Sequence, residues 1–226
     1  MQDIRADLER VRERIARAAE RAGRSADDVL LVGVSKTVDI GRIREAIAAG
    51  LGALGENRVQ EAQRKVAEIG RPVAWHLVGH LQTNKVKDAL DLFDVIHAVD
   101  RIELARELDR RARAQGRTVD VLIQVNVGAE PSKGGWPPDA VGVALEAAAR
   151  LEGLKLRGLM TIPPPVERPE EARGWFRLLR ALAERHSLPE LSMGMSGDFE
   201  VAVEEGATMV RVGTAIFGPR PLREMG

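Results

Sequence analysis

The chain has 226 residues, of which 44% are hydrophobic and 30% charged, and its 34 basic residues balance its 34 acidic residues. A balanced charge carries no electrostatic signature of binding to nucleic acid or to an anionic membrane. The chain contains no cysteine, which excludes disulfides and thiolate metal sites and favours a reducing compartment.

The N-terminal stretch MQDIRADLERVRERIARAAERAGR lacks the apolar segment of a signal peptide, and no apolar run in the chain is long enough to span a bilayer. We therefore expect a cytoplasmic protein that is not bound to a membrane. The same stretch places Ile4, Leu8, Val11, Ile15 and Ala22 at helical spacing among charged residues. This pattern predicts an amphipathic N-terminal helix that packs on the rest of the protein.

After this helix, short β-rich segments alternate with helical segments. The predicted strands cover residues 29–35, 53–56, 74–79, 94–99, 120–126, 156–162, 191–195 and 208–218, and the predicted helices cover residues 39–49, 57–69, 82–92, 101–115, 137–151, 168–186 and 198–206. Such alternation predicts βαβ units and a parallel sheet. Eight strands in this length favour a single-domain (β/α)₈ TIM barrel over residues 1–226, with an extra N-terminal helix. An open doubly wound sheet is the alternative.

In a TIM barrel the functional residues lie at the carboxyl ends of the strands, and the loops after the last two strands often hold a phosphate. The residues expected at these ends are Ser35, Lys36, Glu56, Asn57, His80, Asp100, Asn126, Met160, Thr161, Ser196, Gly197 and those from Arg211 to Thr214. This set combines a lysine, an arginine, and small polar or glycine residues near the last two strands.

Lys36 ends the apolar run VLLVGVSKT, and it is one of only six lysines among the 34 basic residues. Its position is equally consistent with a structural ion pair to Glu56 and with a catalytic or Schiff-base lysine. Arg211 has two similar interpretations. It either ties loops together or binds an anion or a ring, and its place on the strand nearest the expected phosphate favours the second.

Two patterns in the sequence resemble binding motifs but stand in the wrong context. GLGALG, from Gly50 to Gly55, matches the dinucleotide-binding pattern but follows a predicted helix instead of a strand, so Gly50 is expected to end that helix. His76 and His80 have the spacing of zinc ligands on a helix, but they lie on a predicted strand and loop with no third ligand nearby. We expect no metal site, with His76 in the core and His80 on the functional rim.

Seven stretches carry a resemblance to a known family, and they occur in the family's order from residue 32 to residue 218. They are VGVSKT (32–37), GENRVQEA (55–62), WHLVGHLQTNK (75–85), QVNVGAEPSKGG (124–135), RGLMTI (157–162), LSMGMSGD (191–198) and VRVGTAIFG (210–218). Together they make the chain resemble the YggS/PLPBP family of pyridoxal phosphate homeostasis proteins, historically described as "alanine racemase, N-terminal".

The resemblance implies the racemase barrel without its second, β-rich domain, and it implies pyridoxal 5′-phosphate as the cofactor. The residues it assigns to cofactor binding are Lys36, Asn57, Ser196, Gly197, Arg211, Gly213 and Thr214. By this resemblance Lys36 forms the Schiff base, Arg211 lies by the pyridine nitrogen, and Asn57 lies near the phenolic side of the ring. The remaining four residues grip the phosphate.

Three functions are compatible with this site. The first is a carrier that serves pyridoxal phosphate homeostasis with no dedicated reaction and no catalytic residue, with apo forms of pyridoxal phosphate-dependent enzymes as partners. The second is a pyridoxal phosphate-dependent amino-acid racemase. Related racemases use a tyrosine as the second acid/base, and this chain has no tyrosine, although His80 or Lys133 could substitute. The third is an aldolase whose lysine binds the substrate itself. The first is favoured, and a monomer is expected.

Overall fold

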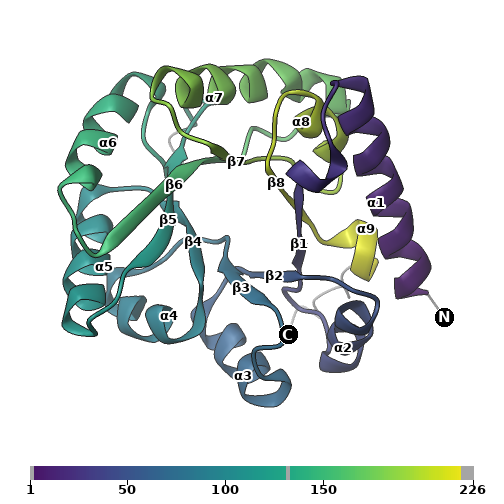
Figure 1. The fold of residues 1–226 in the computed structure, drawn as a ribbon, viewed down its shortest axis with the longest axis horizontal. Coiled ribbons are helices and arrows are strands. Elements are labelled where there is room, and N and C mark those ends of the chain that lie inside the picture. The colour runs from purple at the N-terminus through teal and green to yellow at the C-terminus, as the bar shows by residue number, and fades with distance from the viewer. Residues whose placement is uncertain (1–2, 131–132, 220–226) are drawn as a thin grey trace.

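The strands form one closed parallel barrel in chain order, as seen in the computed structural model, which describes residues 3–130 and 133–219 (Figure 1). The strands are β1 (Leu30–Val34), β2 (Ala53–Glu56), β3 (Ala74–Leu77), β4 (Val95–Val99), β5 (Val119–Val125), β6 (Leu154–Thr161), β7 (Glu190–Ser192) and β8 (Met209–Val212). Because β8 pairs with β1 in parallel, the sheet has no open edge. The predicted TIM barrel is confirmed, and the alternative of an open sheet is wrong.

Helices surround the barrel. They are α1 (Ile4–Arg21), α2 (Ile40–Ala48), α3 (Val59–Ile69), α4 (Val86–Leu92), α5 (Ile102–Ala114), α6 (Val141–Ala149), α7 (Arg173–Arg185), α8 (Phe199–Glu204) and α9 (Thr214–Phe217). Short 3₁₀ turns precede β1, α4, α6 and α7 at Ala26–Asp28, Thr83–Lys85, Pro138–Ala140 and Pro169–Ala172. None of the helices in the described ranges combines the length and the apolar character needed to cross a bilayer.

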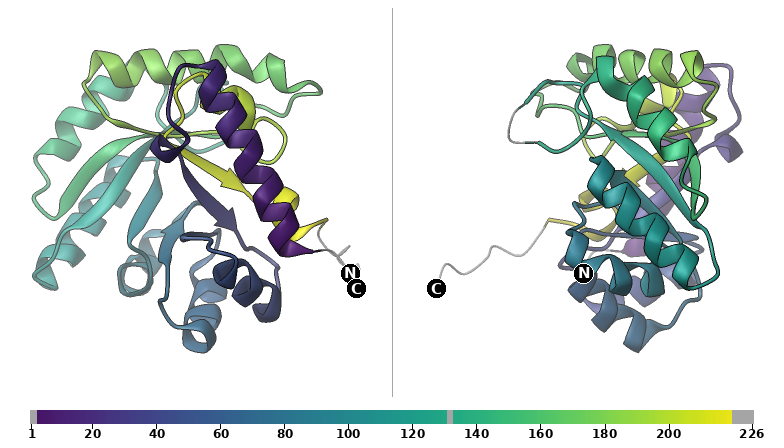
Figure 2. Two further views of the ribbon diagram at one scale, coloured as in Figure 1. Left: turned by 45° about the vertical axis from the view of Figure 1, so that its right-hand side comes forward. Right: turned by 90° about the vertical axis from the view of Figure 1, so that its left-hand side faces the viewer.

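The predicted N-terminal helix is α1. The Asp3 side chain caps it by accepting a hydrogen bond from the Ala6 amide at 3.1 Å. Its buried face contains Ile4 and the other apolar residues named above, except Ala22, which follows the last helical residue. This face packs against α8 and α9, and Figure 2 shows α1 lying across that side of the barrel. The helix therefore closes the outside of the β8 and β1 junction.

Several element boundaries differ from the predicted ones. The eighth strand was predicted to run to residue 218, but β8 ends at Val212 and the segment Thr214–Phe217 forms α9. A short apolar run does not distinguish strand from helix by its pattern, and that ambiguity caused the error. Gly50, with φ of +88°, follows the end of α2, so GLGALG is a helix end leading into β2, as predicted.

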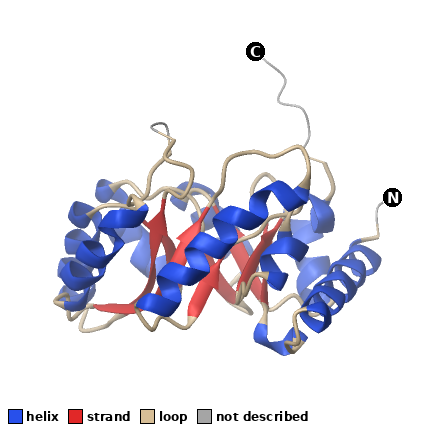
Figure 3. Ribbon diagram, turned by 90° about the horizontal axis from the view of Figure 1, so that it is seen from above, coloured by secondary structure: helices blue, strands red, loops and turns tan. Residues whose placement is uncertain are grey.

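The core has two layers. The larger one lies between the strands and the helices, and the smaller one fills the inside of the barrel, where Val32, Ala53, Leu122 and Met160 are buried. The strand arrows point towards one rim, which is uppermost in Figure 3. Residues that follow the strands are therefore gathered at this rim, and the site is built there.

Candidate functional site

A pocket of about 240 Å³ opens at this rim. Six of the seven predicted cofactor-binding residues line it: Lys36, Asn57, Ser196, Arg211, Gly213 and Thr214. The seventh, Gly197, follows Ser196 in the same turn but is not among the lining residues. Four apolar residues that were not predicted complete the wall: Val34, Val78, Ile162 and Met195. Val34 could have been found from the alternation of side chains along the first strand, because it lies two residues before Lys36.

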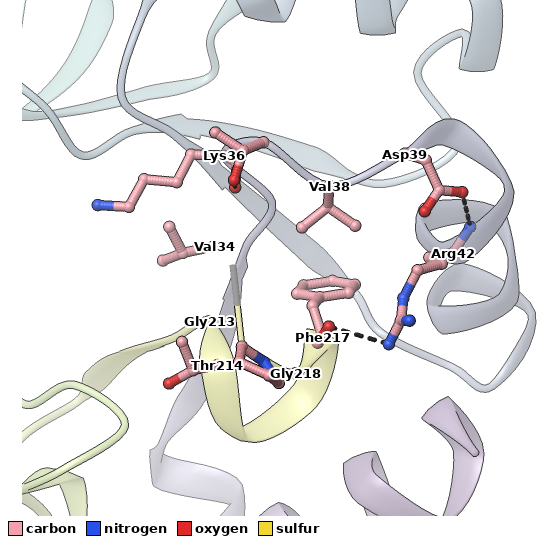
Figure 4. A pocket seen from close by; sticks show the side chains of 11 residues that line it. Val34, Lys36, Val38, Asp39, Arg42, Gly213, Thr214, Phe217 and Gly218 are labelled. Atoms are coloured by element: carbon pink, nitrogen blue, oxygen red, sulfur yellow. Dashed lines mark hydrogen bonds between the residues drawn. The ribbon is translucent and has the colours of Figure 1, made fainter. Parts of the chain in front are cut away.

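Lys36 follows β1 and is half-buried at the mouth of the pocket. Its side chain runs away from Arg42, towards the side of Val34, in Figure 4. On the Arg42 side lies an adjoining hollow of about 260 Å³, where Arg42 Nη2 donates to the Phe217 carbonyl oxygen at 2.9 Å. Glu56, the ion-pair partner considered for Lys36 from the sequence, pairs with Lys65 at 2.7 Å.

Two backbone amides converge beside Ser196. The amide nitrogens of Gly213 and Ala215 lie 3.2 and 3.4 Å from Ser196 Oγ, which accepts a hydrogen bond from each. Backbone N–H groups that converge on one oxygen can equally receive an oxygen of a phosphate. Both amides come from the start of α9.

Asp198, the residue just before α8, is bonded to the turn that carries Ser196. Its carboxylate accepts a hydrogen bond from the Met195 amide at 2.6 Å. Burial raises the pKa of Asp198, against the opposing effects of the Met195 amide and of the Arg211 charge. The carboxylate thus ties down the turn that carries Ser196, and it adds a negative group at the start of α8.

Arg211 lies within β8, one residue before the strand ends at Val212. It is 4% exposed, and its side chain reaches into the barrel. Nη1 donates to Ser192 Oγ at 2.6 Å, and Nη2 donates to the Thr161 carbonyl oxygen at 2.7 Å. Burial lowers the pKa of Arg211 to about 10, so the guanidinium is still cationic at neutral pH.

A chain of hydrogen bonds continues from Arg211 across the inside of the barrel. Ser192 Oγ lies 2.8 Å from His97 Nδ1, and His97 Nε2 lies 2.8 Å from His76 Nδ1. Burial lowers the pKa of His76 to about 4 and the pKa of His97 further, so both rings are neutral at pH 7. Because Ser192 Oγ accepts from Arg211, its own hydrogen can go to His97 Nδ1, and His97 Nε2 then donates to His76 Nδ1.

The predicted position of His76 in the core is confirmed, since the residue is 3% exposed. His80 is on the rim, with its Nδ1 2.8 Å from Asp100 Oδ2. The two histidines therefore do not face a common ion. Within residues 3–130 and 133–219, no group of three or more histidine, aspartate or glutamate side chains is arranged to hold a metal ion.

Asn57 is held in place by a close approach of the backbone. A Cβ atom on Gly79 would lie 2.5 Å from the Asn57 carbonyl oxygen and 2.7 Å from its Cα. Real Cβ atoms do not come so close to backbone atoms, so only glycine fits at position 79. Asn57 is thereby packed against the β3 end of the rim, where it lines the pocket.

His80 and Lys133 lie in a second hollow, of about 440 Å³, which shares Val78 and Ile162 with the pocket. Lys133 Nζ contacts Glu130 Oε1 and the Pro163 carbonyl oxygen, both at 3.1 Å. Both groups considered as substitutes for a racemase tyrosine are therefore near the mouth, and each is bound to its own neighbours.

The fold and the site define a class of protein. It is a TIM barrel in which a lysine after the first strand shares a pocket with a buried arginine of the neighbouring last strand and with the turn where two amides converge. Residues 6–221 match the family described as alanine racemase, N-terminal domain. The chain belongs to this family, and within it to the pyridoxal phosphate homeostasis proteins.

Curated relatives and solved structures agree with this assignment. The pyridoxal phosphate homeostasis protein of Aquifex aeolicus is 49% identical over 220 residues, which cover 94% of this chain and 96% of that protein. A crystal structure of an unknown protein from Bifidobacterium adolescentis is 40% identical, with a TM-score of 0.90 and coverage of 95% of this chain and 94% of that one.

The structure of PipY from Synechococcus elongatus with pyridoxal phosphate bound is 40% identical, with a TM-score of 0.77, and covers 90% of this chain and 100% of that chain. An alanine racemase from Clostridium difficile is 15% identical with a TM-score of 0.73, which shows a common fold alone. The aligned region covers 98% of this chain but only 58% of the racemase.

Proposed function

We propose that this chain binds pyridoxal 5′-phosphate through a Schiff base on Lys36 and takes part in pyridoxal phosphate homeostasis, with all 226 residues acting as one binding domain. One observation carries the proposal. A single pocket brings together the Lys36 side chain, the cationic Arg211, and the turn around Ser196 where two amides converge. The names of the relatives and the cofactor-bound PipY support the same ligand.

The residues of the pocket fit the parts of this cofactor. Gly213 and Thr214, at the start of α9, offer an amide and a hydroxyl to the phosphate beside Ser196. Asn57 is assigned to the phenolic side of the ring. Gly197 is kept in the phosphate group on the strength of the family resemblance alone.

The bound cofactor supplies an aldehyde that condenses with a primary amine and a ring that withdraws electrons from the resulting carbon centre. Lys36 would provide that primary amine. The part of the pocket wall formed by Val34, Val78 and Ile162 is apolar.

Arg211 argues against a dedicated reaction. A cation beside the ring nitrogen disfavours protonation of that nitrogen, so the ring withdraws electrons weakly. The groups behind Arg211 are the Ser192 hydroxyl and two neutral histidines, and none of them supplies a proton at pH 7. The site suits holding and releasing the cofactor better than catalysing a reaction with it.

A cytoplasmic location, a monomeric state, and apo forms of pyridoxal phosphate-dependent enzymes as partners belong to the same proposal. The absence of cysteine and the balanced charge favour the location. The α1 helix packs against α8 and α9 on the outside of the barrel, which favours the monomer.

An absorbance spectrum of the purified protein with pyridoxal phosphate tests the proposal directly. We expect a visible Schiff-base band that borohydride converts into a covalent label on the peptide containing Lys36. Lys36→Ala should fold and lose both the band and the label, whereas the matched variant of an exposed lysine, Lys87→Ala, should keep them. A label on the Lys133 peptide, or a native protein with no band, would refute the assignment.

A further inference from the structure

Lys36 lies in a turn with a rare backbone conformation. The next residue, Thr37, has φ of +63°, in the left-handed region that β-branched residues avoid. Such a residue is stable only where surrounding contacts hold it. The turn between β1 and α2 is therefore held from outside, and the contacts responsible can be identified.

Two contacts from α3 hold the peptide groups on either side of Lys36. Lys65 Nζ donates to the Ser35 carbonyl oxygen at 2.6 Å, and the Thr37 amide donates to Glu61 Oε1, also at 2.6 Å. Lys65 and Glu61 are joined to each other at 2.8 Å. The carbonyl before Lys36 and the amide after it are thus closed into one ring of hydrogen bonds.

Glu56 anchors this ring to the barrel. Its Oε1 accepts from Lys65 Nζ at 2.7 Å and from Ser35 Oγ at 2.6 Å. Glu56 is fully buried and Lys65 is 5% exposed, so water competes little for these bonds. Glu56 Oε2 has no hydrogen-bond partner in the described part of the chain. We call Glu56, Glu61 and Lys65 the brace.

The contacts within the brace shift the pKa values of its two glutamates. Burial raises the pKa of Glu56, and the nearby Lys65 opposes this effect. Burial also acts on Glu61, but the hydrogen bonds from Lys65 and from the Thr37 amide outweigh it and lower the pKa of Glu61. The cost of removing both charges from water offsets the attraction within such a buried ion pair, so the pair is weak evidence for stability.

We propose that the brace positions Lys36 for attachment of the cofactor, by holding the turn in the conformation that brings the amine to the pocket. The inference rests on the proposed function. Lys65 and Glu61 are positioning residues, since they line a separate hollow and not the cofactor pocket. If the turn relaxed, the Lys36 amine would be spread over many positions, and fewer of them would be within reach of the aldehyde.

Two ligands separate this role from general support of the fold. Pyridoxal 5′-phosphate reacts with Lys36, whereas pyridoxine 5′-phosphate carries an alcohol in place of the aldehyde and binds only through its ring and phosphate. The variants are Lys65→Met, which has a similar length without charge, Lys65→Arg, which keeps the charge, and Glu61→Gln. The matched control is Lys87→Met, at an exposed lysine on α4.

In Lys65→Met we expect the fraction of bound pyridoxal phosphate that borohydride fixes to Lys36 to fall at least about tenfold, the effect of losing one hydrogen bond to a charged group. The affinity for pyridoxine phosphate should stay within about twofold of native, well below that effect. Lys65→Arg should recover part of the covalent fraction, and Lys87→Met should match the native protein.

Each other outcome has a definite meaning. A folded Lys65→Met with a native covalent fraction, or with an equal loss of both ligands, would refute the brace and leave the proposed function intact. A native protein that forms no Schiff base at Lys36 would refute the proposed function instead. Lys65→Met leaves Glu56 charged and without its cationic partner, so this variant could fail to fold. In that case the double variant Lys65→Met/Glu56→Gln, which lacks the buried charge, is used in the assay instead.

A second measurement needs no cofactor. In the cofactor-free protein, the Thr37 amide proton should exchange with solvent faster in Glu61→Gln than in the native protein, because a neutral amide is a weaker acceptor than a carboxylate. Amides in α5, on the far side of the barrel, should exchange at unchanged rates. Equal exchange of the Thr37 amide in both proteins would contradict the inference.

Discussion

Arg211 and Ser192 are joined by a hydrogen bond of 2.6 Å inside the barrel, from Nη1 of the arginine to the serine hydroxyl oxygen. The same hydroxyl lies 2.8 Å from His97, so one small side chain links the guanidinium of the cofactor pocket to a pair of buried histidines. All of these side chains except the serine are large, and they occupy space that barrels usually fill with branched apolar residues. Inside the barrel, the Arg211 end of the pocket therefore rests on the polar side chains of Ser192, His97 and His76.

Removing this link should destabilise the protein. Ser192→Ala leaves one Arg211 N–H and His97 Nδ1 buried with no partner between them, which should lower the free energy of unfolding by about 1–3 kcal/mol. Chemical denaturation measures this change. Thr83→Ala, at an exposed position, is the control and should change little. A stability equal to native in Ser192→Ala would mean that the hydroxyl does not bridge the two groups.

Stability should rise with pH across the acid range because of the buried histidines. The pKa of His76 is lowered from 6.5 to about 4 in the folded protein, so between these values the unfolded chain binds more protons. This contribution is fully present above pH 6.5, is lost as the pH falls towards 4, and amounts to about 3 kcal/mol. The lowered pKa of His97 acts in the same direction.

Urea denaturation at a series of pH values measures this slope. His76→Gln should flatten the dependence between pH 6.5 and 4, whatever its effect on stability at neutral pH. Thr83→Ala, at an exposed position without a titratable side chain, is the control and should keep the native slope. A native slope in His76→Gln would show that this histidine is not the group that resists protonation.

The turn beside α9 should decide affinity for the phosphate. Ser196→Ala or Thr214→Val removes a hydroxyl that can bond to a charged oxygen, which should cost roughly 1.5–3 kcal/mol of pyridoxal phosphate affinity. Pyridoxal without the phosphate should bind the native protein far more weakly and should be indifferent to both substitutions. Titration by absorbance or fluorescence measures these affinities, with Thr83→Val as the control. Equal binding of the phosphorylated and unphosphorylated forms would mean that the phosphate lies elsewhere.

Gly79 should be intolerant of any side chain. In Gly79→Ala the added methyl group meets the backbone of Asn57 at 2.5 Å, so the Asn57 end of the rim must move. We expect a loss of stability of about 1–3 kcal/mol, as for other overpacked sites, and weaker cofactor binding. Gly52→Ala, where the new methyl meets nothing within 4 Å, should be neutral or slightly stabilising. Thermal denaturation and cofactor titration of the two variants make the comparison.

Rapid racemisation of amino acids is not expected. A matched acid/base typically contributes about 10²–10⁴-fold to such a reaction, and the chain has no tyrosine to act as the second one. His80 and Lys133 are bound to Asp100 and Glu130 at the mouth. A turnover number for alanine near the enzyme median of about 10 s⁻¹, abolished by Lys36→Ala, would contradict the proposal. Variants His80→Gln and Lys133→Met would then identify the base.

The sequence by itself determined the barrel and most of the residues of the pocket. Strands and helices alternate, parallel strands end on one face, and Lys36 ends the first buried strand, so its place at the rim follows from local pattern alone. The same reasoning collected Asn57, Ser196 and Thr214 correctly around one mouth. It needed only the order of the elements and the approximate ends of the strands.

Only the tertiary structure decided which side chains meet. The sequence placed Arg211 near the end of the eighth strand, but only the structure shows that its side chain is buried inside the barrel and bonded to Ser192. His97 and Ser192 are 95 residues apart in the chain, and no local pattern pairs them. Glu56 was considered as an ionic partner of Lys36, but it pairs with Lys65 of α3, whose side chain lies at the ends of β1 and β2. The position of Lys65 depends on how α3 packs, which no short-range pattern encodes.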